Sequence, residues 1–382
     1  MKENQKKALN IGARYVIGLV FLFSSFVKGV DPLGTTYKIE DYLNVWSIWG
    51  IGFAWAVPLA QYMAMALIVL EFVVGVMLVF NGFKKLTPWV VALMMTFFTI
   101  TTFIDARTNL VDDCGCFGDA VKLTNWQTFW KNVVLDVFVV LLFVSRSKTS
   151  KFRTERDVMI ALFAIVIMVI FGVYNIKNEP CLDFRPWKIG NQMIPGLESE
   201  EELEVKSYLI YKNKVTGEMK QFESKDFMKF VADNPNYQEE WDFVDSRVEN
   251  PYEIAADGFA MLDTENEDYA TDLIGSDDYL LIMTVHHIDE VDEDGVKAMK
   301  YMKRFASENN MQLVILSSAF PEQMQAFQYE KALSDVDFYF ADETAIKTML
   351  RSNPGFILIR HGVVLGKWHY RNYLDINELE LD

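Results

Sequence analysis

Five long apolar segments constrain this chain more than any other feature of its sequence. They cover residues 11–30, 57–81, 88–106, 128–145 and 157–175. Each is long enough to cross a bilayer, since about 20 apolar residues in a helix span the hydrocarbon core. Backbone polar groups in lipid must be paired within the protein, so we expect a bundle of membrane helices in the first half of the chain.

The second half of the chain is acidic. The chain has 36 Lys and Arg and 53 Asp and Glu, of which 17 and 13 lie in residues 1–180. The balance is therefore +4 for residues 1–180 and −21 for residues 181–382. This acidity argues against nucleic-acid binding, which needs a basic surface. It indicates a solvated domain that an anionic bilayer does not attract.

The basic residues predict an orientation. They gather before the first apolar segment, between the second and third, and between the fourth and fifth: Lys2, Lys6 and Lys7, then Lys84 and Lys85, then Arg146, Lys148, Lys151, Arg153 and Arg156. The positive-inside rule places these three regions, and the N-terminus, in the cytoplasm. The parts that then face outward are residues 31–56, residues 107–127 and everything after the fifth segment. In a bacterial inner membrane that side is the oxidising periplasm, where disulfide chemistry belongs.

Two of the three cysteines, Cys114 and Cys116, lie in the outward connection 107–127 with only Gly115 between them. A disulfide can just close over this spacing, and the strain of so small a ring makes it easier to reduce. The pattern favours a redox or metal-binding loop over a turn with two unreactive thiols. Two thiolates are an incomplete site for copper or zinc, so a metal carrier is the weaker hypothesis and we predict no metal site.

The third cysteine, Cys181, follows the fifth segment on the same side of the membrane. It is a resolving thiol, an intermolecular link or a bystander. Inside the spans, Glu71 and Asp136 either accept protons that thiols release on oxidation or form structural pairs between helices. Charged residues near the outer ends of the spans are expected to pair or to snorkel: Lys28, Asp31, Asp105 and Arg107.

The outward segment 38–56 is rich in tryptophan. Trp46, Trp49 and Trp55 predict an amphipathic helix lying in the membrane interface. A roof over a small-molecule pocket beside the cysteines is the alternative.

Three motifs in residues 10–146 resemble the DoxX/MauE family of small membrane bundles. They are Phe23-Ser24-Ser25-Phe26-Val27-Lys28 with Asp31-Pro32, then Leu70-Glu71 followed by Gly75, and Asp113-Cys114-Gly115-Cys116-Phe117-Gly118. The Cys-Gly-Cys-Phe-Gly stretch points to the MauE branch. The resemblance implies a four-helix bundle that works with a thioredoxin-like partner in methylamine dehydrogenase maturation.

By the same resemblance, Cys114 and Cys116 form a redox pair that passes electrons to a quinone. The candidate accessory residues of this site are Cys181, Glu71, Asp136, Lys28 and Asp113. The fifth apolar segment is an addition to the four-helix pattern.

The second half contains a hairpin and then an α/β pattern. Residues 206–222 alternate around Thr216-Gly217, which predicts a β-hairpin, and a polar helix follows near 224–233. Further on, the periodicity predicts strands and helices in alternation: strands over 279–285, 311–317, 337–341, 355–359 and 363–368, with helices over 292–308, 320–333 and 344–349.

This order over residues 250–372 resembles thioredoxin. Pro354, before the strand Gly355–Ile359, matches the thioredoxin cis-proline. The place of the thioredoxin Cys-x-x-Cys is occupied by Val285-His286-His287-Ile288, so the domain cannot exchange disulfides by itself. Adjacent histidine side chains at a strand end are expected to point apart, which argues against a metal site there. The resemblance therefore implies a domain that docks an extracytoplasmic partner or substrate.

We therefore expect a membrane all-α bundle followed by a soluble α/β thioredoxin-like domain. The expected boundaries are 1–146 for the four-helix domain, 147–180 for a basic loop and fifth helix, 181–250 for a linker and hairpin, and 251–382 for the thioredoxin-like domain. The leading hypothesis is a membrane thiol–disulfide redox protein. The alternative is a non-enzymatic, membrane-anchored binding or assembly protein with structural cysteines.

Overall fold

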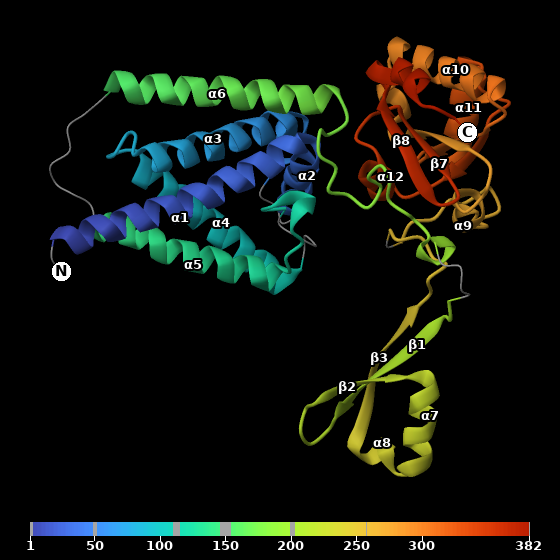
Figure 1. Ribbon diagram of the computed structural model, residues 1–382, viewed down its shortest axis with the longest axis horizontal. Helices are drawn as coiled ribbons and strands as arrows, with labels where there is room; N and C mark the ends of the chain where they lie inside the picture. The colour runs from blue at the N-terminus through green and yellow to red at the C-terminus, as the bar shows by residue number, and fades with distance from the viewer. Residues whose placement is uncertain are drawn as a thin grey trace. The chain divides into compact units, whose positions relative to one another are not determined.

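The computed structural model describes residues 3–48, 52–109, 115–145, 154–198, 203–256 and 258–381. The chain divides into two units, Met1–Arg185 and Pro186–Asp382, and each is described by itself. The predicted fold class is confirmed: apolar helices form the first unit, and an α/β domain with a five-stranded sheet lies in the second (Figure 1).

The helices of the first unit include five that are long and apolar enough to cross a membrane, as predicted. The described elements of this unit are α1 (Glu3–Val30), α2 (Pro32–Ile48), η1 (Ala54–Leu59), α3 (Ala60–Phe80), α4 (Thr87–Thr108), η2 (Gly118–Ala120), α5 (Asn125–Val144) and α6 (Thr154–Lys177). The short helix α2 corresponds to the expected tryptophan-rich helix, with Trp46 packed between Tyr42 and Phe53. Trp49 lies outside the described residues.

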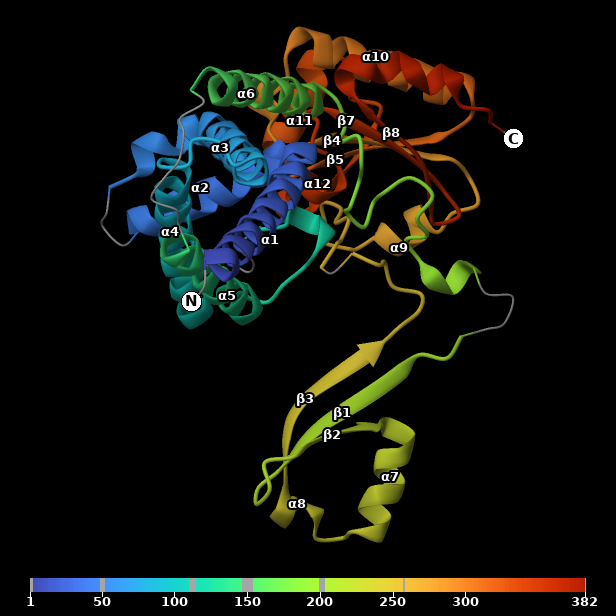
Figure 2. The same cartoon turned by 60° about the vertical axis from the view of Figure 1, so that its left-hand side comes forward.

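Helix α1 organises the bundle, packing against α3, α5 and α6, while α4 packs against α5 (Figure 2). Their shared core is apolar: Ala13, Ile17, Phe21, Val74, Leu78, Val91, Met94, Met95, Leu135, Val139 and Leu142. Large apolar side chains such as Leu93 and Phe163 are exposed on the outside of the bundle. A surface of this kind fits a lipid environment, because soluble proteins rarely expose large contiguous apolar patches.

Helices α1 and α3 approach closely where two glycines face each other. A Cβ on Gly18 would lie 3.2 Å from the carbonyl oxygen of Gly75, and a Cβ on Gly75 would lie 2.9 Å from Cγ of Leu22. Small residues at such a crossing let helix backbones come together in a membrane. This contact holds α1 and α3 in the register that the candidate site requires.

Helix α6 is joined to the C-terminal end of α1. The buried Asn175 side chain donates to the carbonyl oxygen of Gly29 at 3.0 Å, and Phe171 stacks on Phe26. Gly172 faces Met65 of α3, where a Cβ would lie 2.6 Å from the methyl carbon of that side chain. The fifth span is thus packed into the bundle through specific contacts.

The second unit contains two sheets. Its described elements are η3 (Pro195–Glu198), β1 (Lys206–Asn213), β2 (Met219–Glu223), α7 (Ser224–Asp233), α8 (Tyr237–Glu240), β3 (Trp241–Glu249), α9 (Ala270–Ile274), β4 (Leu280–Val285), η4 (Ile288–Glu290), α10 (Glu293–Glu308), β5 (Gln312–Ser317), α11 (Pro321–Lys331), β6 (Asp337–Phe340), α12 (Glu343–Met349), β7 (Gly355–Arg360), β8 (Val363–His369) and η5 (Tyr370–Glu378). The five-stranded sheet has the order β6-β5-β4-β7-β8. Strands β4, β5 and β6 are parallel, whereas β7 pairs antiparallel with β4 and β8.

The central strand β4 is buried on both faces, as its mostly apolar sequence Leu280–Val285 predicts. Alternate side chains reach opposite faces of a sheet. Leu280 and Ile282 pack with α9 and α12, while Leu281 and Met283 pack with α10 and α11. Two cores therefore lie on either side of one sheet.

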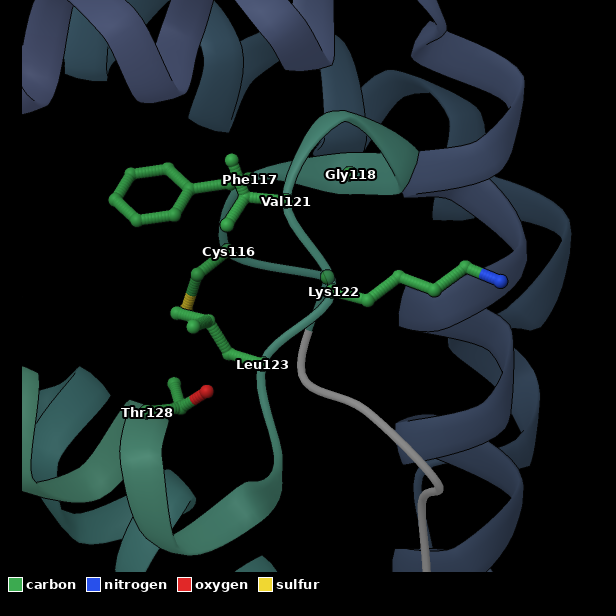
Figure 3. Close-up of a pocket in the computed structure, with 8 residues that line it drawn as sticks. Cys116, Phe117, Gly118, Val121, Lys122, Leu123 and Thr128 are labelled. Atoms are coloured by element: carbon green, nitrogen blue, oxygen red, sulfur yellow. The ribbon is translucent and has the colours of Figure 1, made fainter. Parts of the chain in front are cut away.

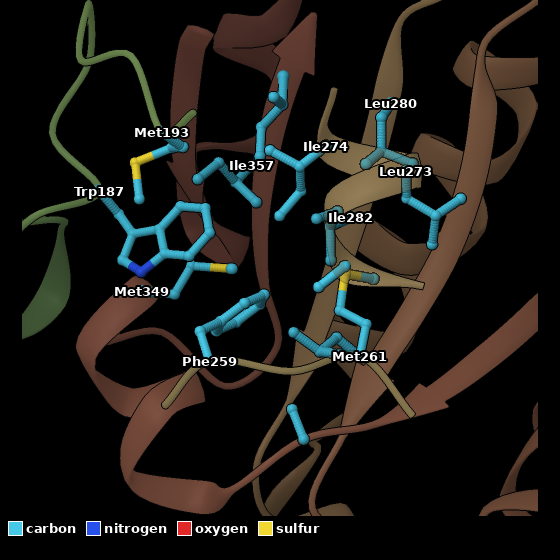
Figure 4. Packing of buried hydrophobic residues seen from close by; sticks show 14 of the residues in the cluster. Trp187, Met193, Phe259, Met261, Leu273, Ile274, Leu280, Ile282, Met349 and Ile357 are labelled. Carbon is cyan, nitrogen blue, oxygen red and sulfur yellow. The ribbon is translucent and has the colours of Figure 1, made fainter. Parts of the chain in front are cut away.

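The core beside α12 also contains residues that the sequence suggests are linker. Trp187, Met193 and Ile194 are buried there with Phe259 and Met349 (Figure 4). The second unit thus begins at Pro186, and the segment 186–197 contributes Trp187, Met193 and Ile194 to its core.

The smaller sheet has the order β2-β1-β3. Its β1–β2 hairpin turns at Gly217, which has a φ of +73°, and α7 follows directly, both as the sequence predicts. Aromatic side chains fill the space between this sheet and α7: Tyr211, Phe222, Phe227, Phe230, Tyr237 and Trp241. Strand β3 was not predicted, since most of its side chains are exposed and show no buried face.

Candidate functional site

The candidate site in the first unit begins with two polar residues on one face of α1. Ser24 and Lys28 are four residues apart, a spacing that places side chains on the same side of a helix. Both are buried, with 8% and 7% exposed. Because they are buried, their polar atoms require hydrogen-bond partners, and these come from other elements.

Glu71 of α3 is the first partner, and only 2% of it is exposed. Its Oε1 accepts a hydrogen bond from Nζ of Lys28 at 2.7 Å, and its Oε2 lies 3.0 Å from Oγ of Ser24. The Lys28 ammonium also lies 5.6 Å from the centre of the Phe98 ring of α4. A buried ion pair of this kind in a membrane bundle is costly unless its members are paired, and here Lys28 and Glu71 pair with each other while Ser24 adds a hydrogen bond to Glu71.

The second partner is the cysteine loop. Oγ of Ser24 lies 2.7 Å from the carbonyl oxygen of Cys116. The single hydroxyl proton of Ser24 can therefore be donated either to Glu71 or to the backbone of Cys116. This contact joins the loop to the buried ion pair.

The residues after Cys116 are fixed against α1 as well. The centre of the Phe117 ring lies 5.3 Å from the centre of the Phe23 ring. Nζ of Lys131 lies 4.4 Å from the centre of the Phe117 ring. Gly118 has a φ of +49°, and a Cβ there would lie 3.2 Å from Val27. Gly115 also has a positive φ, of +60°, so the loop conformation favours glycine at both places.

A small recess lies beside Cys116. It is lined by Gly115, Cys116, Phe117, Gly118, Val121, Lys122, Leu123 and Thr128. The Cys116 side chain points toward Leu123 and Thr128, at the beginning of α5 (Figure 3). With a volume of about 10 Å³ the recess has room for about one water molecule. A quinone ring does not fit there, since sites for small molecules usually measure several hundred Å³.

The predicted site residues are only partly brought together. Lys28, Glu71 and Cys116 form one cluster through Ser24, whereas Cys114 and Asp113 lie outside the described residues. Asp136 accepts a hydrogen bond from Thr99 of α4 at 2.8 Å, and no contact between Asp136 and the cluster is found in the described part of the chain.

Cys181 is exposed, and its backbone N–H donates to Oδ1 of Asn175 at 3.0 Å. Among described residues it makes no contact with Cys116. Close by, the buried Arg185 guanidinium pairs with Asp183 at 2.7 Å and with Glu179 at 3.2 Å, which fixes the fold of the segment that carries Cys181.

Some residues of the site were missed by sequence reasoning. Ser24 carries a weak signal, namely its position one helical turn before Lys28. Tyr42 of α2 donates to the buried Asp105 carboxylate at 2.5 Å, and nothing in the sequence connects residues so far apart. This bond attaches α2 to α4.

The second unit has its own polar corner around Pro354. The Asn353–Pro354 peptide bond is cis. The Asn353 side chain accepts a hydrogen bond from the backbone N–H of His286 at 3.1 Å and donates to the carbonyl oxygen of His287 at 2.7 Å. The proline loop is thereby joined to the end of β4, where a thioredoxin has its cysteines.

The two histidines of this corner differ in exposure. His286 is buried, and its Nδ1 has no hydrogen-bond partner in the described residues, while His287 lies 3.3 Å from Glu343. Their rings meet edge to face at 5.2 Å instead of pointing apart as expected, because β4 ends at Val285. Burial, then His287 and the cations Lys347 and Arg351, lower the pKa of His286 to about 3, so this ring is neutral at physiological pH.

Comparison with known proteins supports the reading of the first unit. Residues 6–145 match the family model described as methylamine utilisation protein MauE. A curated relative, Protein TlpB of Flavobacterium psychrophilum, is 25% identical over 205 residues, which cover 52% of this chain and 53% of the relative. The chain thus spans about half the length of the curated relative that it matches.

Proposed function

We propose that this chain is a membrane thiol–disulfide redox protein in which Cys114 and Cys116 cycle between dithiol and disulfide. The observation that carries the proposal is the Ser24 hydroxyl, which links the backbone of Cys116 to the buried Lys28–Glu71 pair. A loop of two cysteines joined to buried charges inside a membrane bundle is an arrangement that a structural turn does not require. The match to MauE supports the same reading.

Each accessory residue has a place in the proposal. Glu71 is positioned to receive a proton released near the loop, because Ser24 lies between its carboxylate and Cys116. Lys28 compensates the charge of Glu71 when that carboxylate is ionised. Asp113, beside Cys114, would act within the loop itself. Asp136 is a weaker candidate, since it accepts a hydrogen bond from Thr99 of the neighbouring helix and not from a residue of the cluster.

The proposal places the N-terminus in the cytoplasm of a bacterium and the loop and second unit in the periplasm, as the basic flanks favour. The second unit would dock the protein substrate or partner, since it has no cysteine of its own beyond residue 181. Quinone is retained as the class of electron acceptor that the resemblance implies. The recess beside Cys116 is too small for it, so no step is assigned to quinone at that place.

The test is the redox state of Cys114 and Cys116 in native membranes, measured by alkylation after acid quench. We expect the pair to be a disulfide that a reductant opens. When quinone is depleted, the pair should accumulate in the dithiol form. If both cysteines are thiols under every condition, the redox proposal is wrong. The protein would then be a membrane-anchored binding or assembly protein, with the second unit as its binding domain.

A further inference from the structure

Arg14 is a charged residue of the first span that the proposed function does not use. It is the fourth residue of the apolar segment 11–30, and it is partly buried. Its Nε atom is buried and has no hydrogen-bond partner among the described residues. In the same described part of the chain, no carboxylate forms an ion pair with it. A guanidinium in lipid without a counter-charge is costly, and charged residues within spans are usually paired.

The chain offers few acidic residues at this end of the bundle. Eleven Lys and Arg but three Asp and Glu lie in the segments found there, which are residues 1–14, 81–87 and 145–157. Asp157 already pairs with Arg156 at 2.9 Å. Glu3 and Glu155 are both exposed. The counter-charge for Arg14 is therefore expected from an anion outside the chain.

Arg14 lies on the face of α1 that contacts the end of α5. The two helices pack together (Figure 1), and the Asn10 side chain donates to Oγ of Ser145 at 3.1 Å. Residues four apart share a helix face, so Arg14 lies one turn deeper than Asn10 along this contact. Ile11, three residues before Arg14, is 40% exposed on the outside of the bundle. Arg14 thus lies at the border between the α1–α5 contact and the surface that faces lipid.

The depth of Arg14 matches the level of the lipid head groups. Three residues separate it from the start of the apolar segment, a rise of about 5 Å along a helix. The stem of an arginine side chain can cover such a distance while its charged end stays at the interface. Lys7, two turns before Arg14 on the same side of α1, is exposed and adds a second positive charge toward the aqueous phase.

We propose that Arg14 binds the phosphate group of an anionic phospholipid at the α1–α5 border. The guanidinium can donate two parallel hydrogen bonds to phosphate oxygens, and it gives up its hydration more easily than an ammonium does. The surrounding positive charge selects a head group with net negative charge over one whose phosphate is neutralised by choline. The bound lipid supplies the counter-charge that Arg14 does not find in the described part of the chain.

Lipid binding by the full chain tests this site. Binding of phosphatidylglycerol and of phosphatidylcholine with the same acyl chains is measured by native mass spectrometry from detergent micelles. Unfolding temperatures are measured in nanodiscs of phosphatidylcholine with and without phosphatidylglycerol. The variant is Arg14→Gln. The matched control is Arg107→Gln, which removes the same charge from an exposed position at the end of α4.

We expect the parent chain to bind phosphatidylglycerol more tightly than phosphatidylcholine. Arg14→Gln should raise the Kd for phosphatidylglycerol about fivefold or more, the effect of one basic residue at a membrane surface, whereas Arg107→Gln should change it less than twofold. In pure phosphatidylcholine, Arg14→Gln should be at least as stable as the parent chain, because it removes an uncompensated charge from the span.

Three results would overturn the proposal. Equal weakening by Arg14→Gln and Arg107→Gln would mean that phosphatidylglycerol is attracted by overall charge and not by a site. Failure of Arg14→Gln to fold, or a lower unfolding temperature in pure phosphatidylcholine, would give Arg14 a structural role. Equal stabilisation of the parent chain by inorganic phosphate in phosphatidylcholine would assign the site to a soluble anion.

Discussion

The buried Lys28–Glu71 pair makes a quantitative prediction. Both side chains are more than nine-tenths buried and share a 2.7 Å contact. Glu71→Gln keeps an acceptor for Ser24 but removes the carboxylate that pairs with the Lys28 ammonium. Removing one partner of a buried ion pair costs about 3–5 kcal/mol, which is a factor of 100 or more in the unfolding equilibrium. Lys28→Met should cost a similar amount, because it leaves the Glu71 carboxylate alone.

The double variant, Lys28→Met with Glu71→Gln, removes both charges of this pair. We expect it to lie within about 1 kcal/mol of the parent protein, so the two single losses should not add. The assay is the free energy of unfolding in mixed detergent micelles, measured for the four proteins of the cycle. Asp136→Asn is the matched control, since the partner of Asp136 among the described residues is the Thr99 hydroxyl, and a hydrogen bond between membrane helices averages about 0.6 kcal/mol. If the double variant loses the sum of the two single losses, the two residues are not an ion pair in the membrane.

Three further predictions concern packing and pH. Gly75→Val should destabilise the bundle by about 1–3 kcal/mol because the α1–α3 crossing has no space for it, whereas Gly12→Ala, with nothing within 4 Å of its added Cβ, should have little effect on the same unfolding curves. Trp187→Ala should destabilise the second unit by about 3–5 kcal/mol, seen as faster proteolysis within residues 186–382, and unchanged proteolysis would mean that Trp187 is not a core residue. Because the folded pKa of His286 is about 3 and the unfolded value is about 6.5, its contribution to stability is complete above pH 6.5 and is lost as the pH falls toward 3. His286→Gln should therefore remove up to about 2 kcal/mol of the stability loss between pH 7 and pH 5, and a pH profile identical to that of the parent chain would contradict this.

Sequence reasoning predicted much of the architecture because the patterns behind it are local. Each of the five spans is a predominantly apolar run, and such a run is identified directly by its high mean hydropathy. The strands and helices from β4 to β8 lie within a few residues of their predicted bounds, since each has a clear period. Strand β3 was missed because nearly all of its side chains are exposed, so its sequence does not mark one face as buried. Residues 186–197 read as a linker because proline and glycine interrupt them, although Trp187 is fully buried.

The candidate site was predicted less completely because its contacts join distant positions. Lys28 and Glu71 were each recognised as unusual charges, but their pairing depends on how α1 and α3 cross, and that is decided by Gly18 and Gly75. The role of Ser24 was not foreseen, because a serine within an apolar helix usually bonds its own backbone, as Ser25 does.

The packing of α6 has a consequence for how such proteins can be assembled from parts. The match to MauE ends at residue 145, before α6 begins, so the fifth helix could be regarded as a simple tether added by gene fusion. Gly29 packs against Met168 of α6 and its carbonyl oxygen accepts from Asn175, so both contacts need α1 and α6 together, while Gly172 faces Met65 of α3. Excision of α6 would expose a polar carbonyl and a glycine notch on α1 to lipid. A bundle without its fifth helix would thus need other residues on this face of α1. We therefore regard the first 185 residues as one module, and not as a four-helix bundle with a separate tether.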